Sequence, residues 1–216
     1  MKNVLFILCF LLAIPLPTKA ANELVLGKIS VTELEDIYDF YGYHGEKDYL
    51  MIPSYHYPPI FLKHFPSDFN KISDEKKRNA LFIKILAPLA IKLNEEILAE
   101  RKETLEISKH FQSHQELTTK QEKFIEEKAH KYNIFTHLQG HRRYTYLLNE
   151  LEKRIHVIPP SILITAAALE TNWGTSRIVK EGNSLYKTLI WHSDDGLNPI
   201  GEKEDNSYRI NTYPDN

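Results

Sequence analysis

Residues 158–177 read IPPSILITAAALETNWGTSR, an apolar segment between a pair of prolines and a Trp-Gly turn. Pro160 can begin a helix there, because the first N–H of a helix has no partner inside the helix. From Pro160 to Leu169 only Ser161 and Thr165 are polar, and a helix that is apolar all round is typically buried. The segment therefore predicts a buried helix that ends just beyond Leu169.

Glu170 follows this apolar run directly, on the helix face of Leu163, Ala166 and Ala167. A carboxylate on such a face is costly unless it is paired or protonated. Desolvation favours the protonated form of a carboxyl group, which suits a general acid near neutral pH. We expect Trp173 to cover the same position with its apolar ring. The alternative is that Glu170 only ends the helix and points into water, and the chemistry alone leaves both hypotheses open.

Helical periodicity extends upstream of this segment. Apolar residues at spacings of three and four predict a helix that begins near Ser73 or Asp74, each a plausible N-cap. Pro88 is expected to kink or interrupt this helix. The highly charged residues 99–116 are expected to continue it with an exposed surface.

Two further helices are predicted before the apolar segment. Residues 118–122 read TTKQE, which offers a capping box for a helix through about Tyr132. Residues 136–154 place Leu138 and later leucines at helical spacing and predict the second helix.

Two pairs of histidines are spaced four residues apart, His110 with His114 and His137 with His141. This spacing would put each pair on one helix face, where two imidazoles can share a metal ion. Neither pair belongs to an H-E-x-x-H motif, and a solvated helix face is the simpler interpretation.

Residues 22–72 are expected to be irregular. Aromatic side chains crowd this stretch between glycines and prolines; they are Tyr38, Phe40, Tyr41, Tyr43, Tyr49, Tyr55 and Tyr57. One hypothesis is a sugar-binding surface. The preferred one is an extended arm that packs its rings onto the helices.

The composition excludes several classes of protein. Of 216 residues, 42% are hydrophobic and 26% are charged, which is typical of globular proteins and excludes whole-chain disorder or a fibre. A net charge of −2 argues against a protein devoted to nucleic acid. A single cysteine excludes a disulfide framework and a Cys-based zinc cluster.

Residues 1–20 read MKNVLFILCFLLAIPLPTKA and have the features of a signal peptide. Lys2 is the basic start, and the apolar run from Val4 to Ile14 is shorter than the ~20 residues that a membrane span needs. Export with cleavage is therefore predicted rather than a membrane anchor. We expect a periplasmic protein of a Gram-negative cell, with no membrane attachment after cleavage.

The run LETNWGTS at 169–176, followed by EGNSLY at 181–186, resembles the signature of bacterial glucosaminidases of glycoside hydrolase family 73. These contain the mannosyl-glycoprotein endo-β-N-acetylglucosaminidase-like domain, with the pattern A-x-x-E-S-x-W-G-x-S and then G-N-N-L-F. The resemblance is closest to the Bax-type branch, bacterial proteins unrelated to the apoptosis factor, which also carries I-P-P-S before the helix. It extends upstream through residues 61–101.

The resemblance implies an α+β, mostly α fold, in which a helical N-terminal region precedes a lysozyme-like catalytic lobe with a small β-hairpin. It implies cleavage of the β-1,4 bond after N-acetylglucosamine in peptidoglycan glycan strands, with Glu170 as general acid and no metal or organic cofactor. Trp173 and Gly174 match the turn behind the acid. Gly182 and Asn183 match the turn that leads towards the β-lobe.

A second catalytic carboxylate is usual in glycosidases. The resemblance puts it on a hairpin, which residues 189–191 and the turn Asp194-Asp195-Gly196 predict here. Glu202 and Glu204 are the candidates, although each could instead be a solvated loop charge. The predicted substrate-binding residues are Trp173, Asn183, Tyr186, Trp191, Tyr208 and Tyr213. For Trp191 and Tyr208, packing across the hairpin is an equal alternative.

We expect three parts: a signal peptide at 1–20, an aromatic arm and helical region at 21–117, and a glucosaminidase domain at 118–216. Members of the family continue beyond the position of Asn216 into helices that close the fold. We therefore expect a truncated domain, or N-terminal helices that supply the missing packing. The alternatives are a catalytically inactive peptidoglycan-binding or scaffolding protein, a lytic transglycosylase and a structural helical adaptor.

Overall fold

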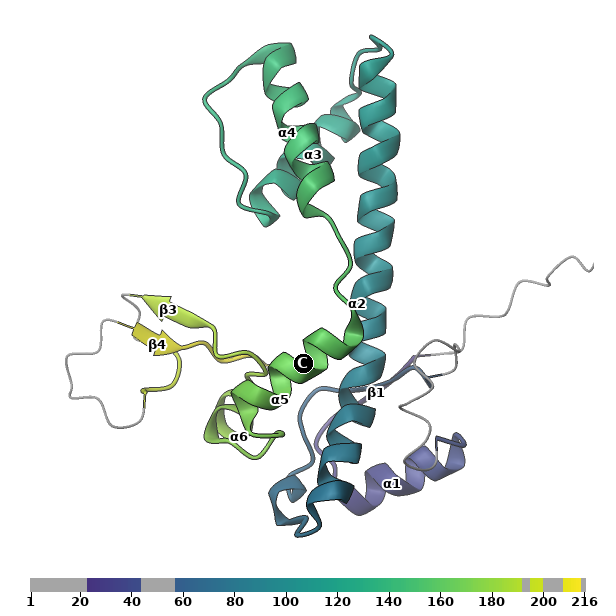
Figure 1. Ribbon diagram of the computed structural model, residues 1–216, viewed down its shortest axis with the longest axis vertical. Coiled ribbons are helices and arrows are strands. Elements are labelled where there is room, and N and C mark those ends of the chain that lie inside the picture. Colours follow the sequence, from purple (N-terminus) through teal and green to yellow (C-terminus); the bar gives the residue numbers. More distant parts are fainter. Residues whose placement is uncertain (1–22, 44–56, 192–194, 200–207, 215–216) are drawn as a thin grey trace, which may run out of the picture.

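The computed structural model describes residues 23–43, 57–191, 195–199 and 208–214. Helices predominate there, and two small two-stranded sheets complete an α+β, mostly α fold, as the sequence predicts (Figure 1). The helices are α1 (Val31–Phe40), α2 (Glu75–Gln112), α3 (Thr119–Lys131), α4 (Gly140–Arg154), α5 (Pro160–Thr171) and α6 (Arg177–Gly182), with a short 3-10 helix at Phe69–Lys71. The strands are β1 (Leu24–Leu26), β2 (Ile60–Leu62), β3 (Leu189–Trp191) and β4 (Tyr208–Ile210).

Helix α2 is the longest element and runs through both halves of the molecule (Figure 1). Its N-cap is Asp74, whose carboxylate accepts hydrogen bonds from the N–H groups of Lys76 at 2.9 Å and Lys77 at 3.2 Å. The helix is not interrupted at Pro88, which is buried inside it. Buried neighbours lie on both sides of this proline, so packing offsets the missing hydrogen bond. These neighbours are Ile85, Leu86, Ala87 and Ala90.

The first half of α2 carries one hydrophobic core, which we call the lower core. Most of its members come from α1, β2, α2 and α5, and they include Leu34, Ile60, Phe82, Ile85 and Ala167, all fully buried. Strands β1 and β2 pair in parallel, with Leu24 opposite Ile60.

The prediction of an irregular arm over residues 22–72 is wrong where the structure describes it, because α1, β1 and β2 lie there. A capping box of Ser30 and Glu33 begins α1 and stabilises it locally. The rings of Tyr38, Tyr43 and Tyr57 pack edge to face, with centroids 5.0 Å and 5.7 Å apart, in or against the lower core. These three rings pack as the preferred hypothesis expected, whereas Phe40 is exposed; Tyr49 and Tyr55 lie outside the described residues.

The second half of α2 carries a separate core with α3 and α4, which we call the upper core. Its most buried members are Ile107, Ile125, Leu147, Leu148, Leu151 and Ile155. The predicted capping box of α3 is confirmed, because Thr118 and Gln121 each accept a hydrogen bond from the other's backbone N–H, at 3.3 Å and 2.9 Å. Helix α4 begins at Gly140, later than predicted. The hydroxyl of Thr136 accepts the N–H of Leu138 at 3.1 Å, a local turn that competes with helix.

Glu100 ties α2 to α3. Its carboxylate accepts hydrogen bonds from Lys128 at 2.8 Å, Lys131 at 2.6 Å and the hydroxyl of Tyr132 at 2.9 Å. Burial is the largest single influence and raises the pKa of Glu100, but the three hydrogen bonds and the charge of Lys128 together outweigh it. The net result is a pKa below the usual value.

A Glu100→Gln variant is expected to lose about 1–3 kcal/mol of unfolding free energy at neutral pH, because two ammonium groups lose their shared acceptor charge. Since folding lowers this pKa, the contribution is complete above the unfolded pKa near 4.5 and is lost as the pH falls through the folded value. Urea unfolding at neutral pH and at about pH 3 measures the difference. The exposed Glu103→Gln on the same helix is the control, and a loss that does not shrink in acid contradicts the prediction.

The segment between α4 and α5 is fastened to α2. The side-chain amide of Asn94 donates to the carbonyl of Ile158 at 2.7 Å and accepts from its N–H at 3.1 Å. Arg101 donates to the carbonyls of Glu152 and Ile155 at 2.8 Å and 2.7 Å. These bonds fix the start of α5, which crosses the lower half of α2 (Figure 1).

Candidate functional site

Helix α5 begins at Pro160, as predicted, but only one of its faces is buried. That face packs against α2 and consists of Ile164, Ala167, Ala168 and Thr171. On the opposite face Ile162 is 58% exposed and Leu169 is 79% exposed. The prediction of a buried helix is therefore right for one face and wrong for the other, within the described residues.

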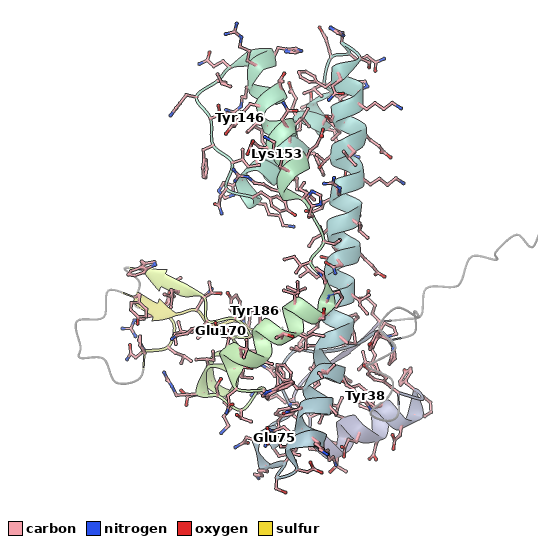
Figure 2. The ribbon with its side chains drawn as sticks, in the orientation of Figure 1. Tyr38, Glu75, Tyr146, Lys153, Glu170 and Tyr186 are labelled. Atoms are coloured by element: carbon pink, nitrogen blue, oxygen red, sulfur yellow. The ribbon has the colours of Figure 1, made fainter. Side chains whose placement is uncertain are left out.

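Glu170 is exposed near the C-terminal end of α5 (Figure 2). The expected desolvation of this carboxylate is therefore wrong, and the alternative that it points into water is the one the described residues show. The ring of Trp173 packs edge to face against Phe82 of the lower core, with centroids 5.7 Å apart, so it is directed to the core rather than laid over the acid as expected.

The turn behind Glu170 is held by the side chain of Thr171, which is fully buried. Its hydroxyl donates to the carbonyl of Ala167 at 2.5 Å and accepts the N–H of Gly174 at 3.0 Å. The next three residues, Asn172, Trp173 and Gly174, have φ values of 48°, 55° and 78°. Such a left-handed run is costly for residues other than glycine, so the buried hydroxyl has a structural task that the sequence did not reveal.

Asn183 serves the second turn. It has a φ of 47°, is 7% exposed, and its amide donates to the carbonyl of Lys63 at 2.7 Å. This bond ties the turn after α6 to the segment after β2. The predicted substrate-binding role of Asn183 stays a prediction, and its observed task is to position the turn.

Tyr186 connects the start of the β-lobe to α5. Its hydroxyl donates to the carbonyl of Leu163 at 3.1 Å, and burial raises the pKa of Tyr186. Leu163 and Glu170 are seven residues apart, so they share one helix face over two turns, about 10 Å. Tyr186 and Glu170 therefore lie on the same side of α5 (Figure 2).

The predicted hairpin is present as an antiparallel pair of β3 and β4. Trp191 lies opposite Tyr208, and their ring centroids are 5.3 Å apart, so packing across the hairpin is confirmed. Trp191 is nonetheless 60% exposed. The N–H of Tyr213 donates to the carbonyl of Gly182 at 2.9 Å and fastens the chain after β4 to the end of α6.

Glu202 and Glu204, the candidates for the second carboxylate, lie outside the described residues, as does Asp194 of the predicted turn. The described residues therefore place Glu170 and Tyr186 along one side of α5, about two turns apart, and the second acid stays a prediction.

The two histidine pairs do not lie on single helix faces. Helix α2 contains His110 but ends before His114. Helix α4 contains His141 but begins after His137. The ring of His141 stacks on Phe111 with centroids 4.5 Å apart, and His110 contacts the carbonyl of Glu116 at 3.0 Å.

The described residues thus define a mostly helical α+β protein with an exposed carboxylate at the end of a helix, beside a small hairpin. The chain is 29% identical over 119 residues to the protein named Bax from Escherichia coli strain K12. The matched stretch covers 55% of this chain and 41% of that protein, so this chain corresponds to less than half of its relative. This distant similarity agrees with the Bax-type signature. No protein-family profile and no solved structure matches the chain.

Within the described residues, none of the helices has both the length and the apolar character required to cross a lipid bilayer.

Proposed function

We propose that this protein is an exported peptidoglycan hydrolase that cleaves the β-1,4 bond after N-acetylglucosamine, with Glu170 as general acid. The observation that carries the proposal is the placement of Glu170, open to solvent on the turn fixed by Thr171 and on the side of α5 reached by Tyr186. A polymer can reach a carboxyl group there. A bound strand would also remove water from Glu170, and this favours the protonated form that a general acid needs.

Two further features support a glycan as substrate. The exposed Trp191 and the half-exposed Tyr186 offer aromatic surface near the hairpin. Aromatic rings combine a large apolar face with a polar edge, which suits a sugar that is apolar on its ring faces and polar around them. The similarity to a protein named Bax adds support from the sequence.

The proposal also includes steps and segments that the described residues do not test. Glu202 or Glu204 supplies the second carboxylate, unless the acetamido group of the substrate takes that role. Residues 1–20 direct export to the periplasm, residues 118–216 form the glucosaminidase domain, and no cofactor takes part.

The exposure of Glu170 also favours a second candidate, a protein that binds peptidoglycan without cutting it. A general acid is usually buried or held by neighbouring groups, whereas Glu170 is exposed. On this hypothesis the aromatic surface binds glycan strands, and Glu170 is a polar contact.

Digestion of purified peptidoglycan by the full chain separates these functions, with the soluble products identified by mass spectrometry. Reducing N-acetylglucosamine ends are expected. Products with 1,6-anhydro ends would show a lytic transglycosylase instead. Sedimentation of the folded protein with peptidoglycan, without soluble products, would replace the hydrolase by the binding protein.

A further inference from the structure

A cavity of about 250 Å³ lies between α6 and the chain from His64 to Asn70, which follows β2. Gly174 also lines it, so the cavity borders the turn behind Glu170. Within the described residues, its lining includes neither Glu170 nor any of the predicted substrate-binding residues. The cavity is therefore separate from the candidate site on α5.

The buried part of the lining is apolar. Phe69 is 2% exposed, Val179 is 4% exposed, and Pro66 is buried. The rings of Phe65 and Phe69 pack edge to face, with centroids 5.1 Å apart. A Cβ on Gly174 would lie 3.0 Å from a ring carbon of each, so the turn packs tightly against both rings. These residues form a fixed apolar surface on which a small apolar group can bind.

The more exposed part of the lining is polar. It consists of an imidazole, a hydroxyl, an amide and an ammonium group, from His64, Ser67, Asn70 and Lys180. None of these four side chains makes a hydrogen bond or ion pair with another residue that the structure describes. All four can donate a hydrogen bond, so together they can bind a group rich in acceptors.

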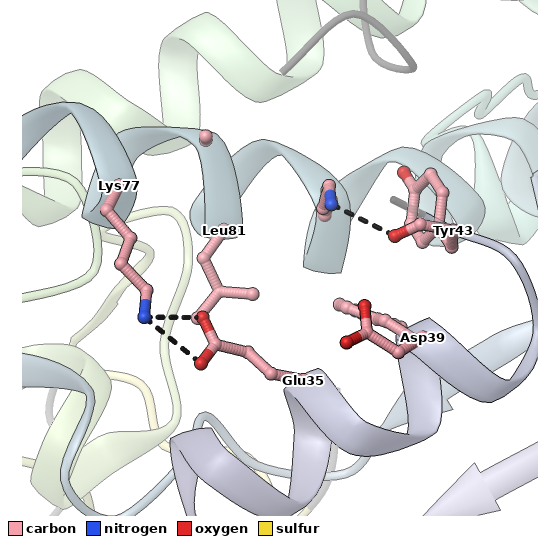
Figure 3. Close-up of a pocket in the computed structure, with 8 residues that line it drawn as sticks. Glu35, Asp39, Tyr43, Lys77 and Leu81 are labelled. Carbon is pink, nitrogen blue, oxygen red and sulfur yellow. Dashed lines mark hydrogen bonds and ion pairs between the residues drawn. The ribbon is translucent and has the colours of Figure 1, made fainter. Parts of the chain in front are cut away.

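A second cavity, between α1 and the first half of α2, differs in this respect (Figure 3). The Nζ atom of Lys77 lies 2.8 Å from a carboxylate oxygen of Glu35, and Lys84 donates to the carbonyl of Tyr43 at 3.0 Å. These charged groups are already bound to other groups of the protein, so they give no reason to expect a ligand. The polar groups of the cavity beside α6 do give one.

The charge of this lining restricts the ligand. Lys180 brings a permanent positive charge, and no carboxylate belongs to the described lining. The acidic neighbours of the lining in the sequence are engaged elsewhere. Asp68 accepts the N–H of Val31 at 2.8 Å, and Glu181 accepts a hydrogen bond from Arg177 at 3.0 Å. A single ammonium group without an opposing carboxylate favours an anion of one charge.

We propose that this cavity binds a small monocarboxylic acid, with its carboxylate at Lys180 and its apolar group against Phe69 and Val179. The volume is below the ~300–1,000 Å³ usual for drug-sized ligands, so the apolar group is small. The inference does not depend on the proposed function.

Titration calorimetry of the full chain with benzoate tests the proposal. Benzoate is expected to bind with a Kd of about 1 mM or tighter, a reasonable strength for so few atoms. Benzamide keeps the shape without the charge, and acetate keeps the charge without the ring. Each is expected to bind at least about tenfold more weakly, because the first loses the attraction of Lys180 and the second the apolar contact.

The source of the carboxylate is distinguished by a second pair of ligands. N-acetyl-L-alanine and N-acetyl-D-alanine imitate the C-terminus of a peptide, whereas benzoate is a free acid. Tighter binding of either acetylated alanine than of benzoate would identify a peptide C-terminus as the source, and the reverse order would identify a free acid.

Variants of Lys180 place the binding in this cavity. Lys180→Met is expected to weaken benzoate binding at least about tenfold. Lys180→Glu is expected to bind benzylammonium more tightly than benzoate, which reverses the order of the wild type. Lys120→Met makes the first change at an exposed position on α3 and is expected to bind benzoate as the wild type does. Thermal unfolding checks that each variant is folded.

Three results would each overturn the proposal. They are equal affinity of the wild type for benzoate and benzamide, undiminished binding of benzoate by Lys180→Met, and the absence of carboxylate binding by folded wild-type protein.

Discussion

Glycan cleavage by a Glu170→Gln variant is expected to be about 10²–10⁴-fold slower than by the wild type, because glutamine cannot supply the proton of a general acid. The fold should not change. Glu170 is exposed, and its carboxylate makes no hydrogen bond or ion pair with the other described residues; such surface substitutions usually cost little stability. The initial rate of release of reducing ends measures the first effect, and thermal unfolding measures the second.

Glu181→Gln is the matched control for this variant. Glu181 is an exposed glutamate on α6, paired with Arg177 at 3.0 Å, and an exposed pair of this kind contributes little. Its variant should cleave glycan at the wild-type rate. Wild-type turnover by Glu170→Gln would show that the proton comes from another group and that the proposed mechanism is wrong.

The same assay addresses the second carboxylate. If Glu202 or Glu204 activates water or forms the glycosyl intermediate, the glutamine variant of that residue alone should be slowed to a similar extent as Glu170→Gln. Full activity in both single variants and in the double variant would instead favour catalysis assisted by the acetamido group of the substrate.

The parts of the fold that could be predicted from the sequence are those decided by neighbouring residues. The capping box of Thr118 and Gln121 and the helix start at Pro160 depend on side chains within one turn of the helix terminus. The pairing of β1 with β2 is different. Parallel strands separated by α1 and many further residues leave no local pattern, so residues 22–72 were expected to be irregular.

The candidate site could also be predicted from the sequence only in part. The position of Glu170 at the end of an apolar helix could be predicted, but its exposure could not, because exposure depends on which face α2 covers. The bonds from Tyr186 to Leu163 and from Asn183 to Lys63 join residues 23 and 120 positions apart. No spacing rule indicates contacts at such separations, yet they tie the segment before β3 to α5 and to the chain after β2.

Thr171 shows why a motif position can hide a structural role. Its hydroxyl is the acceptor for the N–H of Gly174 in a turn of three left-handed residues. A serine keeps that acceptor, so a pattern with serine at this position is compatible with the same turn. The sequence places a small hydroxyl residue next to the acid, and only the structure shows that the hydroxyl faces the turn and not a substrate.

Gly174→Ala is expected to be among the most destabilising substitutions in the lower core. The φ of +78° already disfavours any residue with a Cβ, at a cost of roughly 1–2 kcal/mol. The added Cβ would also lie 3.0 Å from ring carbons of Phe65, Phe69 and Phe82. These rings contact one another in the core, so relieving the clash must move several of them. Overpacking of this kind costs roughly 1–3 kcal/mol, for a total loss of about 2–5 kcal/mol.

Gly140→Ala separates the two contributions to this loss. Gly140 also has a positive φ, +56°, but a Cβ there would meet nothing within 4 Å, so only the backbone cost applies. The unfolding free energy of Gly140→Ala should therefore fall by about 1–2 kcal/mol. Urea unfolding of both variants beside the wild type measures the difference. If Gly174→Ala were no less stable than Gly140→Ala, the three phenylalanine rings would not enclose the turn behind Glu170, and the rigidity that the proposed acid requires would have to come from Thr171 alone.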